Sequence, residues 1–196
     1  TGFRIHSYAS GTASIYQSFR RAPGFLDVVA YHGSSSSAHT IQHTLGAVPE
    51  MMIVKKRSAS DFWAVYHSGI GNNAFLRLNT DADKTTPTAL WDTTTPTATH
   101  FTVGNDPAVN DSGATYIAYL FATLSGVSKV GTYDGTGNNV DVDCGFAAGA
   151  RFVMIKRTDI VSSGDWYIWD TARGIVSGND PYFLLNSTTA EVTTTD

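Results

Sequence analysis

The sequence predicts an all-β protein: an antiparallel β-sandwich of the concanavalin or jelly-roll type, with an internal repeat of about 100 residues. Three observations favour this fold class. Short runs of aromatic and β-branched residues recur at a spacing of roughly ten residues, separated by Gly, Ser, Asn and Asp. Glutamate, a good helix former, occurs only at Glu50 and Glu191. The same motifs also appear twice, in the same order along the chain.

The predicted strands are apolar runs rich in residues that suit a pleated surface. Their boundaries are set by turn sequences such as SGIGNN, YDGTGNN, SSGD and SGND. In chain order, the strands are MMIV (51–54), WAVYH (63–67), FLRL (75–78), YIAYLFA (116–122), FVMI (152–155), WYIWD (166–170) and YFLL (182–185).

Alternation along two of these strands predicts which aromatic residues face the core. Trp63 shares a face with Val65, and its counterpart Trp166 also has an aliphatic residue two positions later. Both tryptophans are therefore expected to be largely buried. Tyr66 and Trp169 point to the opposite faces of their strands, where an exposed aromatic platform is expected.

The repeat is visible as ordered pairs of motifs. The corresponding residues are Tyr31 and Tyr133, Trp63 and Trp166, and Asn79 and Asn186, which lie 102, 103 and 107 positions apart.

The repeat also divides the chain into units. The segment that starts at Ser10 corresponds to the segment that starts at Ser112. Residues 1–26 are thus interpreted as the end of a preceding unit, residues 27–126 as a complete unit and residues 127–196 as the start of a second unit. We expect an excerpt of a longer protein; the alternative is that two half-units close one sandwich.

Charge and hydropathy exclude several classes of partner. The formal net charge is −4 and the longest basic cluster is residues 55–57, which argues against a nucleic-acid-binding face and against anchoring on anionic membrane. No stretch approaches the roughly 18 apolar residues that a membrane span needs, so no membrane insertion is expected. The single cysteine, Cys144, excludes an internal disulfide.

The sequence lacks the groupings that catalysis requires. A glycosidase needs two carboxyl groups flanking the bond, and Glu50 and Glu191 stand in separate units. There is no G-x-S-x-G nucleophile elbow. His39 and His43 are about 13 Å apart on a strand, too far to bind one zinc ion. We therefore expect no catalytic residues and no enzymatic activity.

One loop carries a pattern typical of calcium ligands. Asn79, Asp81 and Asp83 alternate along the sequence, as oxygen ligands do in cation-binding loops. The corresponding loop in the second unit keeps Asn186 but lacks both aspartates. Calcium is the one cofactor that the sequence suggests; the alternative is a polar loop capped by asparagine side chains.

Aromatic residues provide the candidates for ligand binding. Tyr66, Trp91, Trp169 and Tyr182 could stack on sugar rings, and Arg173, in the longer of two corresponding loops, could pair with an acidic sugar. For each aromatic residue the alternative is a place in the core, and for Arg173 it is a solvated loop position.

The ordered motifs resemble a repeat domain of unknown function found in tail-fibre and other virion proteins of marine bacteriophages, including cyanophages. They begin with APGFLDVVAYHG, LGAVPEMMIVKKR, DFWAVYH and SGATYIAYLFA and continue through VGTYDGTG, DCGFAAGARFVMIKRTD, DWYIWDTARGI and DPYFLLNSTTAEV, so that nearly the whole chain is covered. The resemblance implies a concanavalin-like or related β-sandwich in a large virion protein. It implies no catalytic site and supplies no binding residues.

These observations together predict a structural module of a phage virion. We expect it in a tail fibre or surface appendage, where it takes part in host attachment by weak, multivalent glycan binding. The expected partners are other virion proteins, a host surface glycan and further copies of the chain, with a trimer implied by the resemblance. The alternatives are a polysaccharide depolymerase on the same scaffold and a purely architectural spacer or capsid decoration protein.

Overall fold

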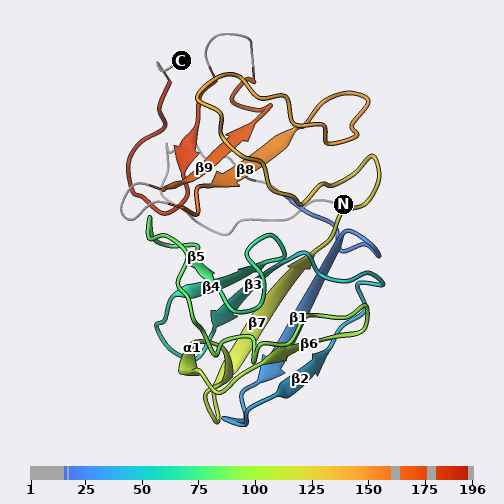
Figure 1. The fold of residues 1–196 in the computed structure, drawn as a ribbon, viewed down its shortest axis with the longest axis vertical. Helices are drawn as coiled ribbons and strands as arrows, with labels where there is room; N and C mark the ends of the chain where they lie inside the picture. Colours follow the sequence, from blue (N-terminus) through green and yellow to red (C-terminus); the bar gives the residue numbers. More distant parts are fainter. Residues whose placement is uncertain (1–15, 17, 160–163, 176–179, 194–196) are drawn as a thin grey trace, which may run out of the picture.

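The computed structural model describes residues 16, 18–159, 164–175 and 180–193. Within these residues the chain forms ten strands and one short helix (Figure 1). In chain order they are β1 (Leu26–His32), β2 (His39–Gln42), β3 (Met51–Lys56), β4 (Trp63–His67), β5 (Leu76–Arg77), β6 (His100–Val103), α1 (Pro107–Asn110), β7 (Thr115–Phe121), β8 (Phe152–Lys156), β9 (Trp166–Asp170) and β10 (Phe183–Leu184).

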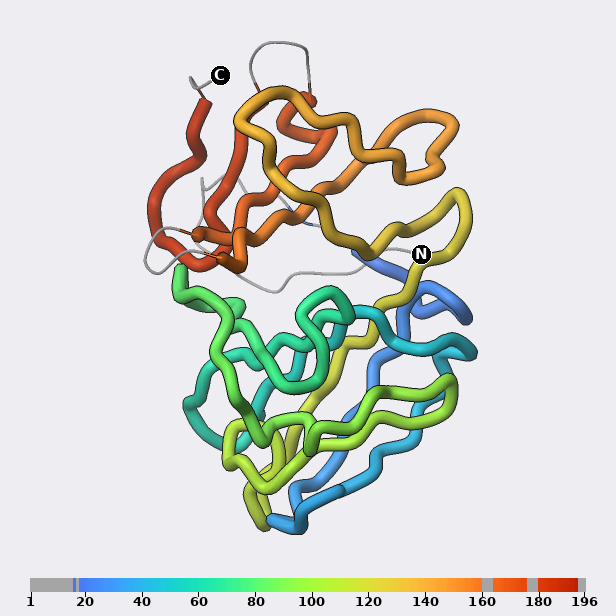
Figure 2. Tube along the Cα trace, viewed as in Figure 1, coloured from blue at the N-terminus to red at the C-terminus, as the bar shows by residue number. Residues whose placement is uncertain are grey.

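The strands form three sheets, and every paired neighbour is antiparallel. The largest sheet has the order β1-β7-β3-β4-β5, a second has the order β10-β9-β8, and β2 pairs with β6. The chain leaves β7 and crosses into the upper half of the view in Figure 2, which holds the three-stranded sheet. The prediction of a β-rich, antiparallel protein is confirmed. In the described residues α1 is the single α-helix, and its four residues are far too few to cross a membrane.

One face of the five-stranded sheet packs against β2, β6 and the loops around them. Alternate residues of β3, β4 and β7 point to this side because successive side chains of a strand face opposite ways. Trp91 and Phe101 cover them and are fully buried. The sheet residues of this core include Met52, Val54, Ala64, Tyr66, Tyr116, Ala118 and Leu120.

The opposite face of the same sheet packs against the three-stranded sheet. Ile53, Val65 and Leu76 form a buried cluster with Trp166, and Met154 packs against it. The Trp166 indole Nε1 donates a hydrogen bond of 2.8 Å to the carbonyl oxygen of Arg77, which joins the two sheets. The five-stranded sheet is therefore covered on both faces at β3 and β4, whereas β1 exposes Val28, Ala30 and His32. Trp166 is buried as expected, whereas Trp63 stays partly exposed at the edge of the same cluster.

Buried polar groups attach the loops to this framework. The Asp27 carboxylate pairs with Arg21 and accepts hydrogen bonds from the backbone N–H groups of Val28 and Thr44. Burial raises the pKa of Asp27, but these hydrogen bonds outweigh that effect and hold the pKa below its ordinary value. Asp27 thus joins the start of β1 to the segment that follows β2.

His43 is a second buried polar group, and the network assigns its tautomer. The backbone N–H of Leu45 donates to Nδ1 at 3.3 Å, so Nε2 carries the proton and donates to the Thr97 carbonyl at 3.1 Å. A proton on Nδ1 would point at the Leu45 N–H and would remove this hydrogen bond. Burial lowers the pKa of His43, although the Thr97 hydrogen bond and the charge of Asp27 act the other way.

The two corresponding tryptophans give a matched pair for a stability measurement. We expect Trp166→Ala to lower the free energy of unfolding by about 3–5 kcal/mol, since it empties a buried site and removes the bond to Arg77. Trp63→Ala should cost clearly less because the Trp63 side chain is already partly in water. Urea unfolding of both variants measures the difference, and equal losses would contradict this account of the two sites.

Acid should destabilise the protein in two stages. Below pH 6.5 an unfolded chain protonates His43 and His67, whereas burial lowers the pKa of both histidines in the folded protein, so stability falls as pH drops. Below pH 3.8 the unfolded chain protonates Asp27 while the folded protein does not, which adds a second loss. Unfolding free energies measured from pH 8 to 3 should show both stages. His43→Gln should reduce the first loss of stability, and Asp27→Asn should reduce the second. If the plot of unfolding free energy against pH keeps the same slopes in both variants, this assignment is wrong.

Candidate functional site

Three aromatic side chains meet on the outer face of the three-stranded sheet, away from the five-stranded sheet. Tyr167 and Trp169 lie two residues apart on β9 and therefore share a face, with ring centroids 5.7 Å apart and nearly parallel. Tyr182, just before β10, lies 5.3 Å from the first ring and 5.9 Å from the second. All three are half-buried. We refer to Tyr167, Trp169 and Tyr182 as the aromatic cluster.

The aromatic cluster contains two of the five residues predicted to bind a ligand, Trp169 and Tyr182. Tyr167 was not predicted, although its position two residues before Trp169 was a signal that could have found it. Burial raises the pKa of Tyr167, and the charge of Asp165 and the Tyr182 phenol add to this effect. The Tyr167 phenol therefore stays neutral and can donate a hydrogen bond.

Tyr66 and Trp91 lie elsewhere, in the core between the five-stranded sheet and β6. Trp91 has no exposed surface, its ring meets Tyr66 edge-on at 5.8 Å, and its Nε1 donates to the Ala74 carbonyl at 3.0 Å. Neither ring can stack on a ligand that arrives from solvent. The alternative interpretation of these two residues, a place in the core, is the one that the structure favours.

Arg173 also differs from its expected setting. Its side chain is only 2% exposed, pairs with Asp170 at 2.6 Å, and lies 4.2 Å above the ring of Phe183. Phe183 precedes Leu184 and faces the opposite side of β10 from it. Arg173 is therefore a packed residue that is separate from the aromatic cluster, and it is neither a solvated loop arginine nor an open anion contact.

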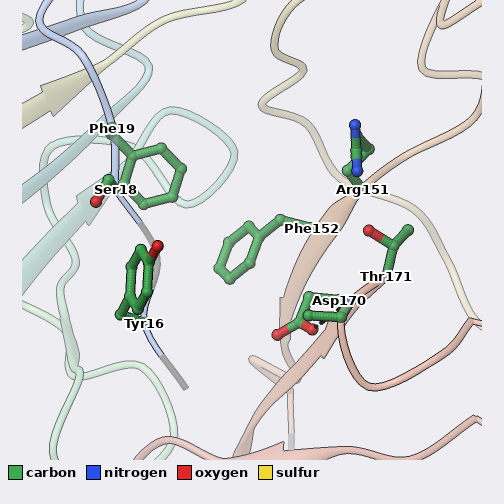
Figure 3. Close-up of a pocket in the computed structure, with 8 residues that line it drawn as sticks. Tyr16, Ser18, Phe19, Arg151, Phe152, Asp170 and Thr171 are labelled. Atoms are coloured by element: carbon green, nitrogen blue, oxygen red, sulfur yellow. Dashed lines mark hydrogen bonds between the residues drawn. The ribbon is translucent and has the colours of Figure 1, made fainter. Parts of the chain in front are cut away.

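A cavity of about 210 Å³ lies beside the ends of β8 and β9 (Figure 3). Its described lining contains one carboxylate, Asp170, whose Oδ1 accepts hydrogen bonds from the backbone N–H groups of Ala172 and Arg173. These contacts hold the turn after β9. Glycoside hydrolysis uses two carboxyl groups, one as acid and one as base or nucleophile. The described lining supplies one carboxylate, and its hydrogen bonds stabilise a turn. The lining residues are Tyr16, Ser18, Phe19, Arg151, Phe152, Asp170, Thr171 and Ala172.

Two oxygen atoms of the predicted calcium loop accept hydrogen bonds from other parts of the protein. Oδ1 of Asn79 accepts a hydrogen bond from the Trp63 backbone N–H at 3.0 Å. The Lys156 ammonium donates to the carbonyl oxygens of Asp81, at 2.8 Å, and Gly164. Burial lowers the pKa of Lys156, opposed mainly by the charge of Asp81. The loop thus holds a lysine cation, and no group of three or more His, Cys, Asp or Glu side chains in the described ranges is placed to hold a metal.

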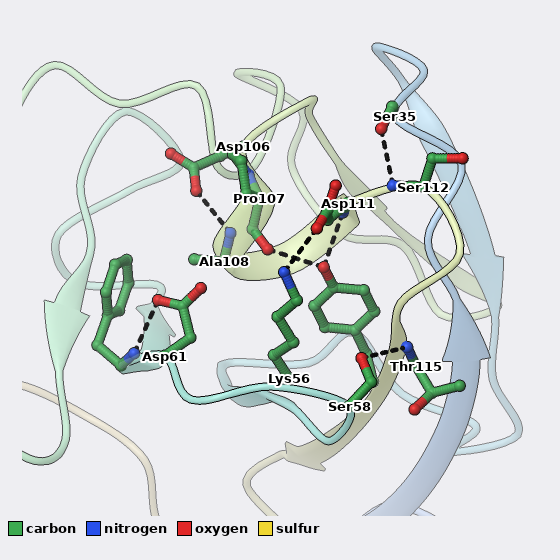
Figure 4. Close-up of polar contacts among 12 residues, drawn as sticks. Ser35, Lys56, Ser58, Asp61, Asp106, Pro107, Ala108, Asp111, Ser112 and Thr115 are labelled. Atoms are coloured by element: carbon green, nitrogen blue, oxygen red, sulfur yellow. Dashed lines mark hydrogen bonds and ion pairs between the residues drawn. The ribbon is translucent and has the colours of Figure 1, made fainter.

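A second polar cluster joins α1 to β3 and β7 (Figure 4). The Lys56 ammonium pairs with Asp111 at 2.7 Å, and this hydrogen bond raises the pKa of Lys56. The Tyr116 hydroxyl donates to the Pro107 carbonyl and accepts from the Asp111 N–H, both at 2.7 Å. Tyr116 also stacks on Tyr31 at 5.1 Å. Each of these groups has a partner within the fold. The cluster therefore stabilises the packing of α1 against β3 and β7, and it offers no activated nucleophile.

Comparison with known proteins identifies the family of the chain. No curated protein and no solved structure matches it. One family profile, described as Domain of unknown function (DUF7483), matches residues 5–196. The match covers nearly the whole chain, so the chain belongs to this domain family of unknown function.

Proposed function

We propose that this chain is a non-catalytic structural module of a bacteriophage virion, carried in a tail fibre or surface appendage, and that it contains one complete repeat unit of about 100 residues and the start of a second. The observation that carries the proposal is a pair of matched strand meanders, β3-β4-β5 and β8-β9-β10. Repeated modules that stack on their neighbours build extended proteins with large binding surfaces. The virion setting is supported by the resemblance of the sequence motifs.

The two meanders share an unusual hydrogen bond. The backbone N–H of Trp63 donates to Oδ1 of Asn79 at 3.0 Å, and the backbone N–H of Trp166 donates to Oδ1 of Asn186 at 2.7 Å. In both cases the asparagine follows the third strand of the meander and caps the start of the second. This match supports common ancestry of the two segments, because the bond joins residues 16 and 20 positions apart in loops of different length.

The strand registers match as well. Lys55 lies opposite Trp63, and Lys156 lies opposite Trp166. An isolated bridge joins the residue just before the third strand to a residue beyond that strand, Phe75 to Thr85 in one meander and Tyr182 to Val192 in the other. Corresponding residues of these two bridges are 107 positions apart, the separation found between Asn79 and Asn186. The agreement supports a common origin of the two meanders.

The packing of the first unit supports a β-sandwich. The five-stranded sheet and the β2–β6 pair enclose one hydrophobic core, with Trp91 and Phe101 at its centre. Two antiparallel sheets around one core are the defining feature of a sandwich. A concanavalin-like arrangement is the form that the resemblance implies.

Within this proposal the module acts by repetition. Several equivalent surfaces on one appendage raise the effective concentration of each contact, so weak sites can give avidity about 10²–10⁴ times the single-site affinity. The partners are other virion proteins, further copies of the chain, in a trimer by resemblance, and the host surface. A second candidate, glycan binding on the host, is favoured by the half-exposed rings of the aromatic cluster.

The matched asparagines test the repeat. Asn79→Ala and Asn186→Ala should each lower the free energy of unfolding by about 0.5–1.5 kcal/mol, because each removes the acceptor for a tryptophan N–H. Asn138→Ala, in an exposed turn, is the control and should change stability little. Urea unfolding measures the free energy of unfolding of all three variants. A loss in only one of the two asparagine variants would argue that the meanders are not equivalent.

The virion assignment is tested on particles. Antibodies raised against the purified chain should label intact phage particles from a culture that produces it, at tail or surface positions visible by immunogold electron microscopy. Antibodies adsorbed beforehand with the purified chain serve as the control and should not label. Labelling confined to host-cell extracts, with none on purified particles, would refute the assignment.

A further inference from the structure

β1 is an edge strand with one edge open to solvent. The order of the five-stranded sheet places β1 at its end, and β7 is the one strand that pairs with it among the described residues (Figure 1). Its seven residues make it the longest edge strand of the described sheets. Val28, Ala30 and His32 are exposed along it. We call the side of β1 that faces away from β7 the free edge.

The backbone groups of β1 point alternately toward β7 and toward the free edge. The N–H of Gly33 donates to the Ala114 carbonyl, and the N–H of Ala122 donates to the Phe25 carbonyl. Both bonds join residues that lie directly opposite each other in the register of β1 and β7. Because bonding alternates along an antiparallel pair, odd-numbered residues of β1 bond to β7 and even-numbered residues face the free edge.

Two residues on the free edge have both backbone groups unpaired. Leu26 is occupied, because it exchanges two hydrogen bonds with the turn that precedes β1. The N–H of Val28 is occupied as well, since it donates to Oδ1 of Asp27 at 2.8 Å. In the described part of the chain, the N–H and C=O groups of Ala30 and His32 have no hydrogen-bond partner. The free edge thus offers two donors and two acceptors in alternation.

An extended polypeptide is the partner that such an edge fits. A strand that adds to a sheet edge supplies donors and acceptors at the same spacing, which is how β-strand addition binds. Proteins commonly prevent this pairing with lysine or proline on edge strands, or with very short ones. The segment from Val28 to Ser34, VVAYHGS, has neither residue and no formal charge with the histidine neutral. At the other end of the sheet, β5 has only two residues.

We infer that β1 pairs with β1 of a second copy of the chain, antiparallel about a two-fold axis, so that two five-stranded sheets join into one. The inference rests on the association between copies proposed above and names the surface that they share. With Tyr31 at the axis, Ala30 of each copy lies opposite His32 of the other. The unpaired groups then form four hydrogen bonds between the copies. A two-fold contact suits them because one edge supplies both sides of the interface.

The length of the unpaired stretch favours a second copy over an unrelated peptide. Beyond Ala30 and His32, the next residues to meet across the edge would be Val28 and Ser34. Their N–H groups are already bonded, to Asp27 and to Oδ1 of Asn110 at 2.8 Å. The ladder between two copies would therefore end where the unpaired N–H groups end. Since residues 28–34 are uncharged with the histidine neutral, the pairing also places no like charges opposite each other.

Sedimentation velocity of the full chain tests the association. We expect a reversible, concentration-dependent dimer with a Kd below about 1 mM. The measurement covers concentrations from about 10 μM to about 1 mM at pH 7.5, where an exposed histidine is neutral.

Two substitutions at one exposed position locate the contact. Ala30→Pro removes an N–H that bonds nothing within the chain, and proline is tolerated at such edge positions. It should weaken association at least about tenfold, because two of the four bonds are lost. Ala30→Lys should have a similar effect by placing two charges near the axis. Tyr133→Lys, at a position 49% exposed outside β1, is the control and should leave association unchanged. Thermal melts establish that each variant is folded.

Amide hydrogen exchange followed by NMR gives a second readout. The amides of Ala30 and His32 should exchange more slowly as protein concentration rises, because the second copy then accepts their hydrogen bonds. The amide of Tyr31 faces β7 and should be protected at every concentration. In Ala30→Pro the concentration dependence at His32 should disappear.

Three results would overturn the inference. The first is a chain that stays monomeric up to about 1 mM. The second is an association of any size that neither Ala30 variant weakens. The third is an association that leaves the exchange of the Ala30 and His32 amides unchanged. Urea unfolding of the asparagine variants and the labelling of particles do not involve the free edge, so the proposed function can hold even when this inference fails.

Discussion

The five-stranded sheet is covered on both faces at β3 and β4, and this is the constraint from which the rest of the fold follows. Its central strands carry apolar residues at consecutive positions, such as Ala64, Val65 and Tyr66, and such strands are stable only when each face is covered. The β2–β6 pair with Trp91 supplies one cover, and Trp166 of the three-stranded sheet supplies the other. Each cover is also joined to the framework by polar bonds, so loops and sheets hold one another in place.

This constraint also explains how far the sequence could predict the structure. The strands at β3, β4, β7, β8 and β9 were predictable because their aromatic and β-branched runs are strong local signals. The alternation of residues along β4 predicted that Tyr66 is exposed. This rule applies to a sheet with one face in solvent, and it fails for β4 because both faces of that strand are buried. It succeeded for Trp169 because β9 is covered on one side only. Helix α1 was missed, although Asp106 caps it and Pro107 starts it.

The candidate site depends on long-range packing, which local patterns do not report. The pairing of Tyr182 with Trp169 arises from the register of β9 and β10, and the burial of Arg173 arises from its contacts with Asp170 and Phe183. The loop around Asp81 has the spacing of a calcium site, but Lys156 of the other sheet donates a hydrogen bond to its Asp81 carbonyl oxygen. In each case the neighbour that decides the role of the residue lies in another strand or sheet.

The pairing of β1 with β7 has a mechanical consequence. Leu26, the first residue of β1, lies directly opposite Phe121, the last residue of β7. The chain therefore enters β1 and leaves β7 at the same end of the sheet. A force applied between these two points would open the β1–β7 ladder one hydrogen bond at a time, starting at that end, and would not load all its bonds together. Under tension the chain would therefore yield at this pair first and lengthen.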